Sequence, residues 1–197
     1  MSPSSDLEAT LAPVVDVLDR LGVTYRIGGS VASATLGVPR STLDIDLVCN
    51  LEAAQVGSLV TALDADYYVD AAAVRAAIAE RRSFNLIHLA TMMKVDVFLV
   101  RDGAYDRTSF DRHVERALSS EPGARSYSFR SPEDVVLRKL EGYRAGGEVS
   151  DRQWADTIGV LKVQGSALDR AYLERWAEAL GVGDLLERAF VEAGAAD

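Results

Sequence analysis

Two aspartates alternate with apolar residues in the short run Asp44-Ile45-Asp46-Leu47-Val48. Successive strand residues point to opposite faces, so a strand here would place both carboxylates on one face, about 6.6 Å apart at the backbone. Neighbouring carboxylates on an apolar strand repel each other and are costly to bury. A divalent cation removes that cost, and hard oxygen ligands suit Mg²⁺. The run predicts a metal-binding strand, although a single D-x-D is also typical of an exposed acidic surface.

A second apolar run, residues 94–100, contains one acid, Asp96. A lone acid inside a buried strand needs a partner. If this strand lies beside the one that carries Asp44 and Asp46, three carboxylates surround one pocket, as a two-metal phosphoryl-transfer site requires. The alternative is that Asp96 faces solvent on an edge strand or pairs with a nearby arginine.

The third element is Gly28-Gly29-Ser30, which lies between a predicted strand at 24–27 and a predicted helix at 31–36. Glycines let a phosphate approach the backbone, a helix N-terminus offers free N–H groups, and a serine adds a hydroxyl donor. The element therefore predicts a phosphate-binding turn. An ordinary tight turn, with Ser30 as the helix N-cap, is the alternative.

These three elements occur in the order typical of one superfamily. The glycine-serine turn, the segment 40–46 that ends in the two aspartates, and the third acid on a later strand together resemble the DNA polymerase β-like nucleotidyltransferases over about residues 24–100. The resemblance implies two Mg²⁺ ions held by Asp44, Asp46 and Asp96. It also implies nucleotide binding by Gly28, Gly29, Ser30 and Arg40, although a loop arginine such as Arg40 is often only solvated.

Hydrophobic periodicity and turn residues predict the remaining elements. Helices are expected at 6–20, 31–36, 53–63, 69–81, 132–144, 151–163, 169–180 and 183–193, and strands at 24–27, 41–48, 83–89, 93–100, 112–118 and 125–129. The fold class is therefore α/β (α+β): a nucleotidyltransferase domain over 1–130, with a mixed β-sheet flanked by helices, and a C-terminal helical bundle over 131–197.

The segments 131–140 and 152–156 resemble the helical part of the AbiEii/MenT-type nucleotidyltransferase toxins and their relatives. In that group a helix lysine and a later aspartate join the active site, which implies catalytic roles for Lys139 and Asp156, with Asp151 a weaker match to the aspartate. The alternatives are a solvated Lys139 and an i,i+4 ion pair between Asp156 and Arg152.

Together these features predict a Mg²⁺-dependent nucleotidyltransferase that moves an NMP from an NTP to an acceptor hydroxyl. The toxin-like tail implies the 3′ end of tRNA as acceptor and an antitoxin protein as partner. A small molecule or a protein hydroxyl is the alternative acceptor. The rival interpretation is a non-catalytic nucleotide-binding or partner-binding protein on the same fold.

Composition limits the other function classes. The net charge of −9 argues against broad nucleic-acid binding, although residues 81–152 carry 13 basic and 11 acidic side chains and offer a local positive face. One cysteine and two histidines argue against disulfides and zinc sites, and Cys49 is expected in the core. The sequence has no signal-peptide or membrane-span pattern, so a cytoplasmic protein with no membrane partner is expected.

Overall fold

The computed structural model describes residues 3–119 and 121–194 of the 197-residue chain. Contacts divide the chain into two compact units. The first consists of Met1–Gly28 and Ser41–Phe129, and the second of Gly29–Arg40 and Arg130–Asp197. The chain therefore crosses from one unit to the other three times, and the short segment Gly29–Arg40 groups with the C-terminal helices. The boundary predicted near residue 130 stays a prediction.

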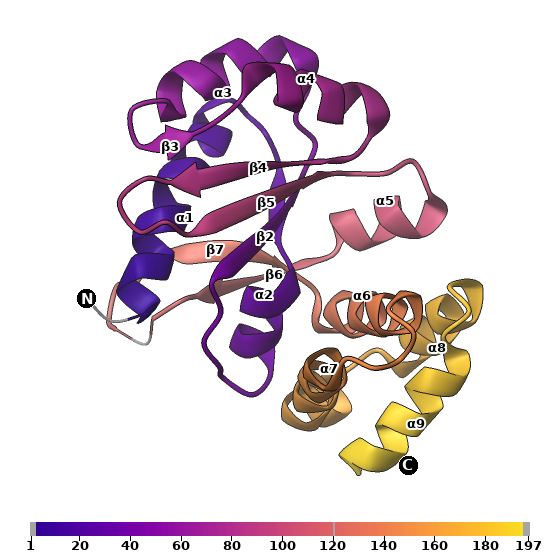
Figure 1. Ribbon diagram of the computed structural model, residues 1–197. Helices are drawn as coiled ribbons and strands as arrows, with labels where there is room; N and C mark the ends of the chain where they lie inside the picture. Colours follow the sequence, from indigo (N-terminus) through magenta and orange to yellow (C-terminus); the bar gives the residue numbers. More distant parts are fainter. Residues whose placement is uncertain (1–2, 120, 195–197) are drawn as a thin grey trace. The chain divides into compact units, whose positions relative to one another are not determined.

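The first unit is built on a mixed sheet of seven strands within the described residues, in the order β3-β4-β5-β2-β1-β7-β6 (Figure 1). The strands are β1 (Tyr25–Ile27), β2 (Asp44–Cys49), β3 (Tyr67–Tyr68), β4 (Ser83–His88), β5 (Lys94–Leu99), β6 (His113–Ala117) and β7 (Ser126–Arg130). β2 runs parallel to β5 and antiparallel to β1, while β4 is antiparallel to both β3 and β5. β1 and β7 are also parallel, so two strand pairs are joined by long connections. The sheet is therefore neither a simple meander nor an all-parallel sheet.

One face of this sheet is apolar and covered by helices. Alternate strand residues are buried there: Ile27, Ile45, Leu47, Cys49, Phe84, Leu86, Val95, Val97, Leu99 and Tyr127. The helix α1 (Pro3–Arg20) lies against this face, because the Tyr67 hydroxyl donates to the Thr10 carbonyl at 2.6 Å and the Tyr127 hydroxyl donates to Glu8 at 3.3 Å. The alternation leaves the other face of the central strands to polar side chains.

The remaining helices of the first unit are short. α3 (Val56–Leu63) follows the 3₁₀ turn η1 (Ala53–Gln55), contacts α1 and precedes α4 (Ala71–Glu80). The α4 helix begins at an N-cap, Asp70, whose carboxylate accepts hydrogen bonds from two backbone N–H groups. α5 (Ala104–Asp111) connects β5 to β6.

The second unit consists of helices. They are α2 (Gly29–Leu36), α6 (Pro132–Ala145), α7 (Asp151–Gln164), α8 (Arg170–Ala179) and α9 (Gly183–Ala193), with the 3₁₀ turn η2 (Gly165–Ala167). α2 packs on α6 and α7, so the segment that follows the glycine turn belongs to this bundle. α6 begins as the sequence predicts: Ser131 Oγ accepts from the Asp134 N–H at 3.2 Å and Pro132 occupies the first turn.

The predicted fold class is confirmed, and the predicted helices and strands are found within a few residues of their expected bounds. Two short elements were not predicted, the strand β3 and the helix α5. Among the described helices, none is long and apolar enough to cross a membrane.

Candidate functional site

The acids of the first unit lie on two adjacent parallel strands. In the β2–β5 pair, Asp46 is the direct partner of Asp96, and Asp44 is the partner of Lys94. Because residues two apart share a face and direct partners point the same way, Asp44, Asp46 and Asp96 all project from the face opposite the apolar core. Asp44 is exposed at the start of β2, and the other two acids are partly buried. The expected juxtaposition of the two strands is therefore present.

Asp96 has two polar neighbours on this face. Lys94 Nζ lies 2.8 Å from Asp96 Oδ2, and this hydrogen bond raises the pKa of the lysine. On the other side, Asn85 of β4 is the direct partner of Asp96, and its amide nitrogen donates to Asp96 Oδ1 at 2.6 Å when the amide is turned to satisfy both of its ends. Asp96 is thus neither alone in the core nor exposed to bulk solvent. Its ion-pair partner is Lys94, whereas the sequence suggested a nearby arginine as the alternative partner.

The carboxylate oxygens of Asp44, Asp46 and Asp96 suit a hard cation, but the three side chains do not point at one common position. Carboxylate oxygens on one sheet face are the ligands Mg²⁺ prefers. Within the described residues, however, no three side chains of the types His, Cys, Asp and Glu form a group ready to hold a metal ion. Lys94 occupies the position beside Asp96 that a cation would need. Metal binding by Asp44, Asp46 and Asp96 therefore fits the residue types and the register, and it stays a prediction.

The glycine turn is divided between the units. Gly28 closes the first unit, and its backbone N–H donates to the Asp46 carbonyl at 2.8 Å, which ties the turn to the acid-bearing strand. Gly29 opens α2 with a φ of 54°, a left-handed conformation that glycine adopts without strain. Ser30 lies within the first turn of α2 rather than ahead of it, so the alternative of Ser30 as the N-cap does not describe this helix.

The second unit contains a charged cluster centred on Asp156. Arg40 Nε donates to Asp156 Oδ1 at 2.7 Å and Arg40 Nη2 donates to Oδ2 at 2.8 Å, a bidentate pair. Lys139 Nζ donates to the same Oδ2 at 2.7 Å. Arg40 Nη2 also donates to Ser30 Oγ at 2.7 Å. Four predicted site residues, Ser30, Arg40, Lys139 and Asp156, are therefore connected by hydrogen bonds within one unit.

Burial and charge determine what this cluster can do. Asp156 and Lys139 have side chains only 5% and 12% exposed, and that of Arg40 is 26% exposed. Burial opposes ionisation of Asp156, but hydrogen bonds from Arg40 and Lys139 outweigh burial and lower its pKa. Asp156 also raises the pKa of Arg40, so this pair is ionised at neutral pH. A carboxylate with a lowered pKa between two cations is a poor general base, and its hydrogen bonds hold Arg40 and Lys139 in place.

These contacts decide between the alternatives for the helix residues. Lys139 is not a solvated helix lysine, because it is largely buried and paired with Asp156. Asp156 has Arg40 and Lys139 as its partners, in place of an i,i+4 pair with Arg152. Cys49 is fully buried, and burial raises its pKa to about 11, so it is a core residue as expected.

Sequence reasoning missed two participants in these clusters. Asn85 and Lys94 flank Asp96, and each lies next to buried apolar residues in its strand. Their alternation with buried residues was a usable signal. The pairing of Arg40 with Asp156 joins positions 116 residues apart, and no local pattern reveals it.

The fold is that of known nucleotidyltransferases. No protein-family model and no curated protein sequence matches the chain. Among solved structures, it is similar to a nucleotidyltransferase-like antigenic protein from Paracoccidioides brasiliensis, with a TM-score of 0.56, 15% identity and coverage of 94% of this chain and 92% of the other. It is also similar to ANT(2″)-Ia in complex with adenylyl-2″-tobramycin, with a TM-score of 0.57, 15% identity and coverage of 88% and 95%. The chain thus has the nucleotidyltransferase fold.

Proposed function

We propose that this protein is a Mg²⁺-dependent nucleotidyltransferase that transfers an NMP from an NTP to an acceptor hydroxyl. The observation that carries the proposal is the register of β2 and β5, which places Asp44, Asp46 and Asp96 on one polar face of a sheet with the nucleotidyltransferase fold. A non-catalytic protein with this fold that only bound a partner would not need three acids on this face, since like charges on neighbouring strands destabilise a sheet.

In this proposal Asp44, Asp46 and Asp96 hold two Mg²⁺ ions. Bound Mg²⁺ would supply Lewis-acid stabilisation of the triphosphate and lower the pKa of the acceptor hydroxyl. The chain's own contribution is positioning, because the strands fix the spacing of the carboxylates. Lys94 is the neighbouring cation that neutralises Asp96 before metal is bound.

The glycine turn and the Asp156 cluster would serve the nucleotide. Gly29 and Ser30, which follow Gly28 in the turn, offer backbone N–H and hydroxyl donors near a helix N-terminus, and Arg40 and Lys139 offer charges suited to phosphate oxygens. Asp156 would act as a positioning residue that holds both cations at fixed geometry. The acceptor oxygen then forms a bond to the α-phosphorus, the bond to pyrophosphate breaks, and the acceptor proton passes to solvent or a carboxylate.

The acceptor has three candidates, a tRNA 3′ hydroxyl, a small molecule and a protein hydroxyl, and an observation favours each of the first two. The tail segments that resemble the AbiEii/MenT-type toxins favour the 3′ hydroxyl of tRNA, which would make the protein a toxin with a protein antitoxin. The similarity to ANT(2″)-Ia bound to an adenylylated aminoglycoside favours a small polyhydroxylated molecule. Both reactions use the same chemistry at the NTP, so the acceptor can be tested separately from the activity.

The test is incorporation of label from each α-³²P-NTP into tRNA or into tobramycin, with and without Mg²⁺. Label that requires Mg²⁺ and disappears in Asp46→Asn supports the proposal and identifies the acceptor and the NTP. Asp64→Asn is a matched control, because Asp64 is an exposed acid at the end of α3. Label that persists in both Asp44→Asn and Asp46→Asn, or absence of any Mg²⁺·NTP binding, would overturn the assignment.

A further inference from the structure

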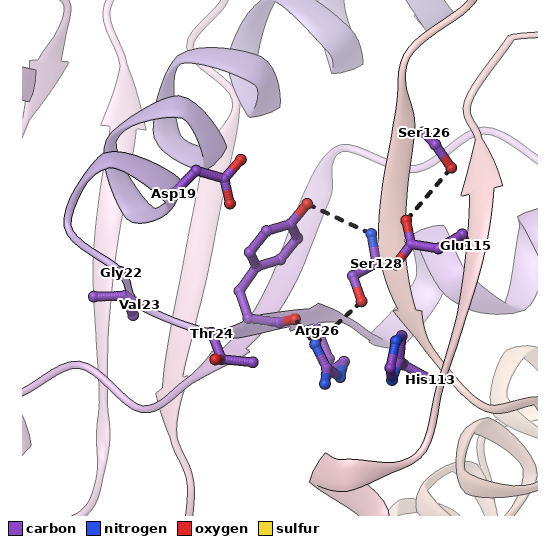
Figure 2. A pocket seen from close by; sticks show the side chains of 10 residues that line it. Asp19, Gly22, Val23, Thr24, Arg26, His113, Glu115, Ser126 and Ser128 are labelled. Atoms are coloured by element: carbon purple, nitrogen blue, oxygen red, sulfur yellow. Dashed lines mark hydrogen bonds between the residues drawn. The ribbon is translucent and has the colours of Figure 1, made fainter.

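A polar pocket of about 500 Å³ lies in the first unit where β1 and β7 separate (Figure 2). The two strands are paired at Ile27 and Phe129. On the N-terminal side of this pair, two side chains of β1 bridge the strands. The backbone N–H of Ser128 donates to the Tyr25 hydroxyl at 3.5 Å, and the Arg26 guanidinium donates to Ser128 Oγ at 3.1 Å. The pocket therefore results from side chains that take the place of strand pairing.

Arg26 is the fixed charge of this pocket. Its side chain is buried, with the residue only 9% exposed, and burial lowers its pKa, an effect that the carboxylates of Glu115 and Asp111 oppose. Nε donates to the Phe110 carbonyl at 3.0 Å and Nη1 donates to the Tyr25 carbonyl at 2.7 Å as well as to Ser128. The guanidinium also lies over the Phe110 ring, 5.2 Å from its centroid. The guanidinium is thus held rigidly before any ligand arrives.

These contacts use the Nε and Nη1 donors of Arg26 and leave Nη2 without an acceptor among the described residues. Ser128 Oγ accepts from Arg26, so its own proton is available to donate. His113, on β6, lies beside Arg26 in Figure 2, and its Nδ1 is 3.2 Å from the Asp111 carbonyl. At this end of the pocket, Arg26 Nη2 and the Ser128 hydroxyl are the donors that an anionic oxygen can use.

The rest of the lining has the opposite charge. Glu115 is exposed, and its carboxylate receives a weak hydrogen bond, 3.4 Å, from Ser126 Oγ. Asp19 is also exposed and receives a 3.3 Å hydrogen bond from Arg125. Figure 2 shows the Asp19 and Glu115 side chains away from the Arg26 guanidinium. Since neither acid is buried in a tight ion pair, both remain available to a cationic group.

The geometry points to a binding site for a free α-amino acid, with its carboxylate on Arg26 Nη2 and Ser128 and its ammonium group toward Glu115 and Asp19. A ligand with one anionic and one cationic group matches both ends, whereas an inorganic anion meets two acids and a simple amine meets the arginine. The lining carries one arginine and two carboxylates, so an amino acid with a second cationic group, such as lysine, satisfies more of the charge. The volume falls within the range of small-molecule sites.

This site is independent of the acids proposed to hold Mg²⁺, and its test uses neither nucleotide nor metal. Binding of L-lysine to the intact chain is measured by isothermal titration calorimetry and compared with cadaverine, which lacks the carboxylate, and with Nα-acetyl-lysine, which lacks the α-ammonium charge. We expect L-lysine to bind at least ten-fold more tightly than either analogue. Equal binding of cadaverine would overturn the role of Arg26, and no binding of L-lysine or of any other proteinogenic amino acid would overturn the site.

Variants of pocket residues test whether the amino acid binds in this pocket or elsewhere on the protein. Arg26→Met removes the guanidinium but also several structural hydrogen bonds, so it can fail to fold. Glu115→Gln changes an exposed side chain and is expected to weaken L-lysine at least five-fold without changing the melting temperature. Glu187→Gln, which alters an exposed acid of α9, is the matched control and is expected to leave binding unchanged. Unchanged affinity in Glu115→Gln would show that the amino acid binds elsewhere.

Discussion

Asp46 and Asp96 lie directly opposite each other on the parallel strands β2 and β5. Like charges in direct cross-strand register destabilise a sheet, so the pair is a cost unless a cation offsets it. Lys94 provides part of that compensation from the same face. The arrangement is therefore poised to gain free energy when a divalent ion binds.

The first prediction concerns stabilisation by the metal. At a Mg²⁺ concentration ten times the dissociation constant, binding to the folded state contributes about 1.4 kcal/mol, which raises the melting temperature by roughly 3–5 °C. Asp46→Asn removes a ligand and is expected to abolish this rise. Differential scanning calorimetry with and without Mg²⁺ measures it. A variant that is stabilised by Mg²⁺ as much as the unmodified chain would contradict the assignment of Asp46.

A second prediction follows from the 2.8 Å contact between Lys94 and Asp96. A cation at Asp96 competes with the Lys94 ammonium group, so Lys94→Gln should lower the Mg²⁺ concentration needed for half-saturation by about three- to ten-fold, which corresponds to about 0.7–1.4 kcal/mol. Mn²⁺ titration followed by electron paramagnetic resonance measures free metal directly. Arg82→Gln is the control, because Arg82 is an exposed arginine just before β4. Weaker metal binding in Lys94→Gln would show that the lysine supports the site instead of competing for it.

Local patterns explain why much of the fold was predictable. The first four residues of the strand that carries Asp44 and Asp46 alternate polar and apolar side chains, and the structure buries the two apolar ones while leaving the aspartates at least partly exposed. β3 has only two residues, too few to show a period. α5 has only two buried residues, Tyr105 and Ser109, and its N-cap Gly103 makes no side-chain capping bond, so neither periodicity nor a start signal marked it.

The candidate site was predictable only where its residues are close in sequence. The two aspartates of β2 are two residues apart, and strand geometry alone puts them on one face. The opposition of Asp46 and Asp96 depends on which strands become neighbours, a matter of tertiary packing. The same holds for Arg40 and Asp156, 116 residues apart, whose pairing no local pattern reveals.

The pH dependence of stability provides a third prediction. Since hydrogen bonds from Arg40 and Lys139 lower the pKa of Asp156 below that of an ordinary aspartate, ionised Asp156 contributes stability that is fully present above about pH 4 and is lost as the pH falls through the folded-state pKa. At pH 7, Asp156→Asn should cost about 3 kcal/mol, because two partly buried cations lose their partner. Below pH 4 this cost should shrink, by at most about 1.4 kcal/mol per pH unit.

Urea unfolding of both proteins between pH 2.5 and 7 measures this difference in the free energy of unfolding. Asp64→Asn, at an exposed acid, should show no comparable pH-dependent difference. A cost of Asp156→Asn that stays constant down to pH 2.5 would mean that the carboxylate does not titrate with the folding equilibrium, and would contradict the role of the Arg40 and Lys139 hydrogen bonds.

The last prediction tests the packing that holds the α2 segment in the second unit. A Cβ atom added at Gly37 would lie 2.8 Å from the Ser33 carbonyl oxygen, 2.8 Å from the Val160 nitrogen and 2.9 Å from the Gly159 carbonyl carbon. All three are backbone atoms, so α2 and α7 would have to separate. Gly37→Ala should therefore lower the free energy of unfolding by about 1–3 kcal/mol. Because Arg40 follows Gly37 by three residues, the same change should also weaken NTP binding.

Gly57→Ala is the matched control, since a Cβ atom there meets nothing within 4 Å and the residue lies in the helix α3. Alanine has the higher helix propensity, so this variant should be as stable as the unmodified chain or more stable by up to about 1 kcal/mol. Urea denaturation gives both values, and NTP binding is measured on the folded proteins. If Gly37→Ala unfolds at the same urea concentration as Gly57→Ala, the close approach of α2 to α7 is not present in solution. If stability falls but NTP binding does not, Arg40 does not contact the nucleotide.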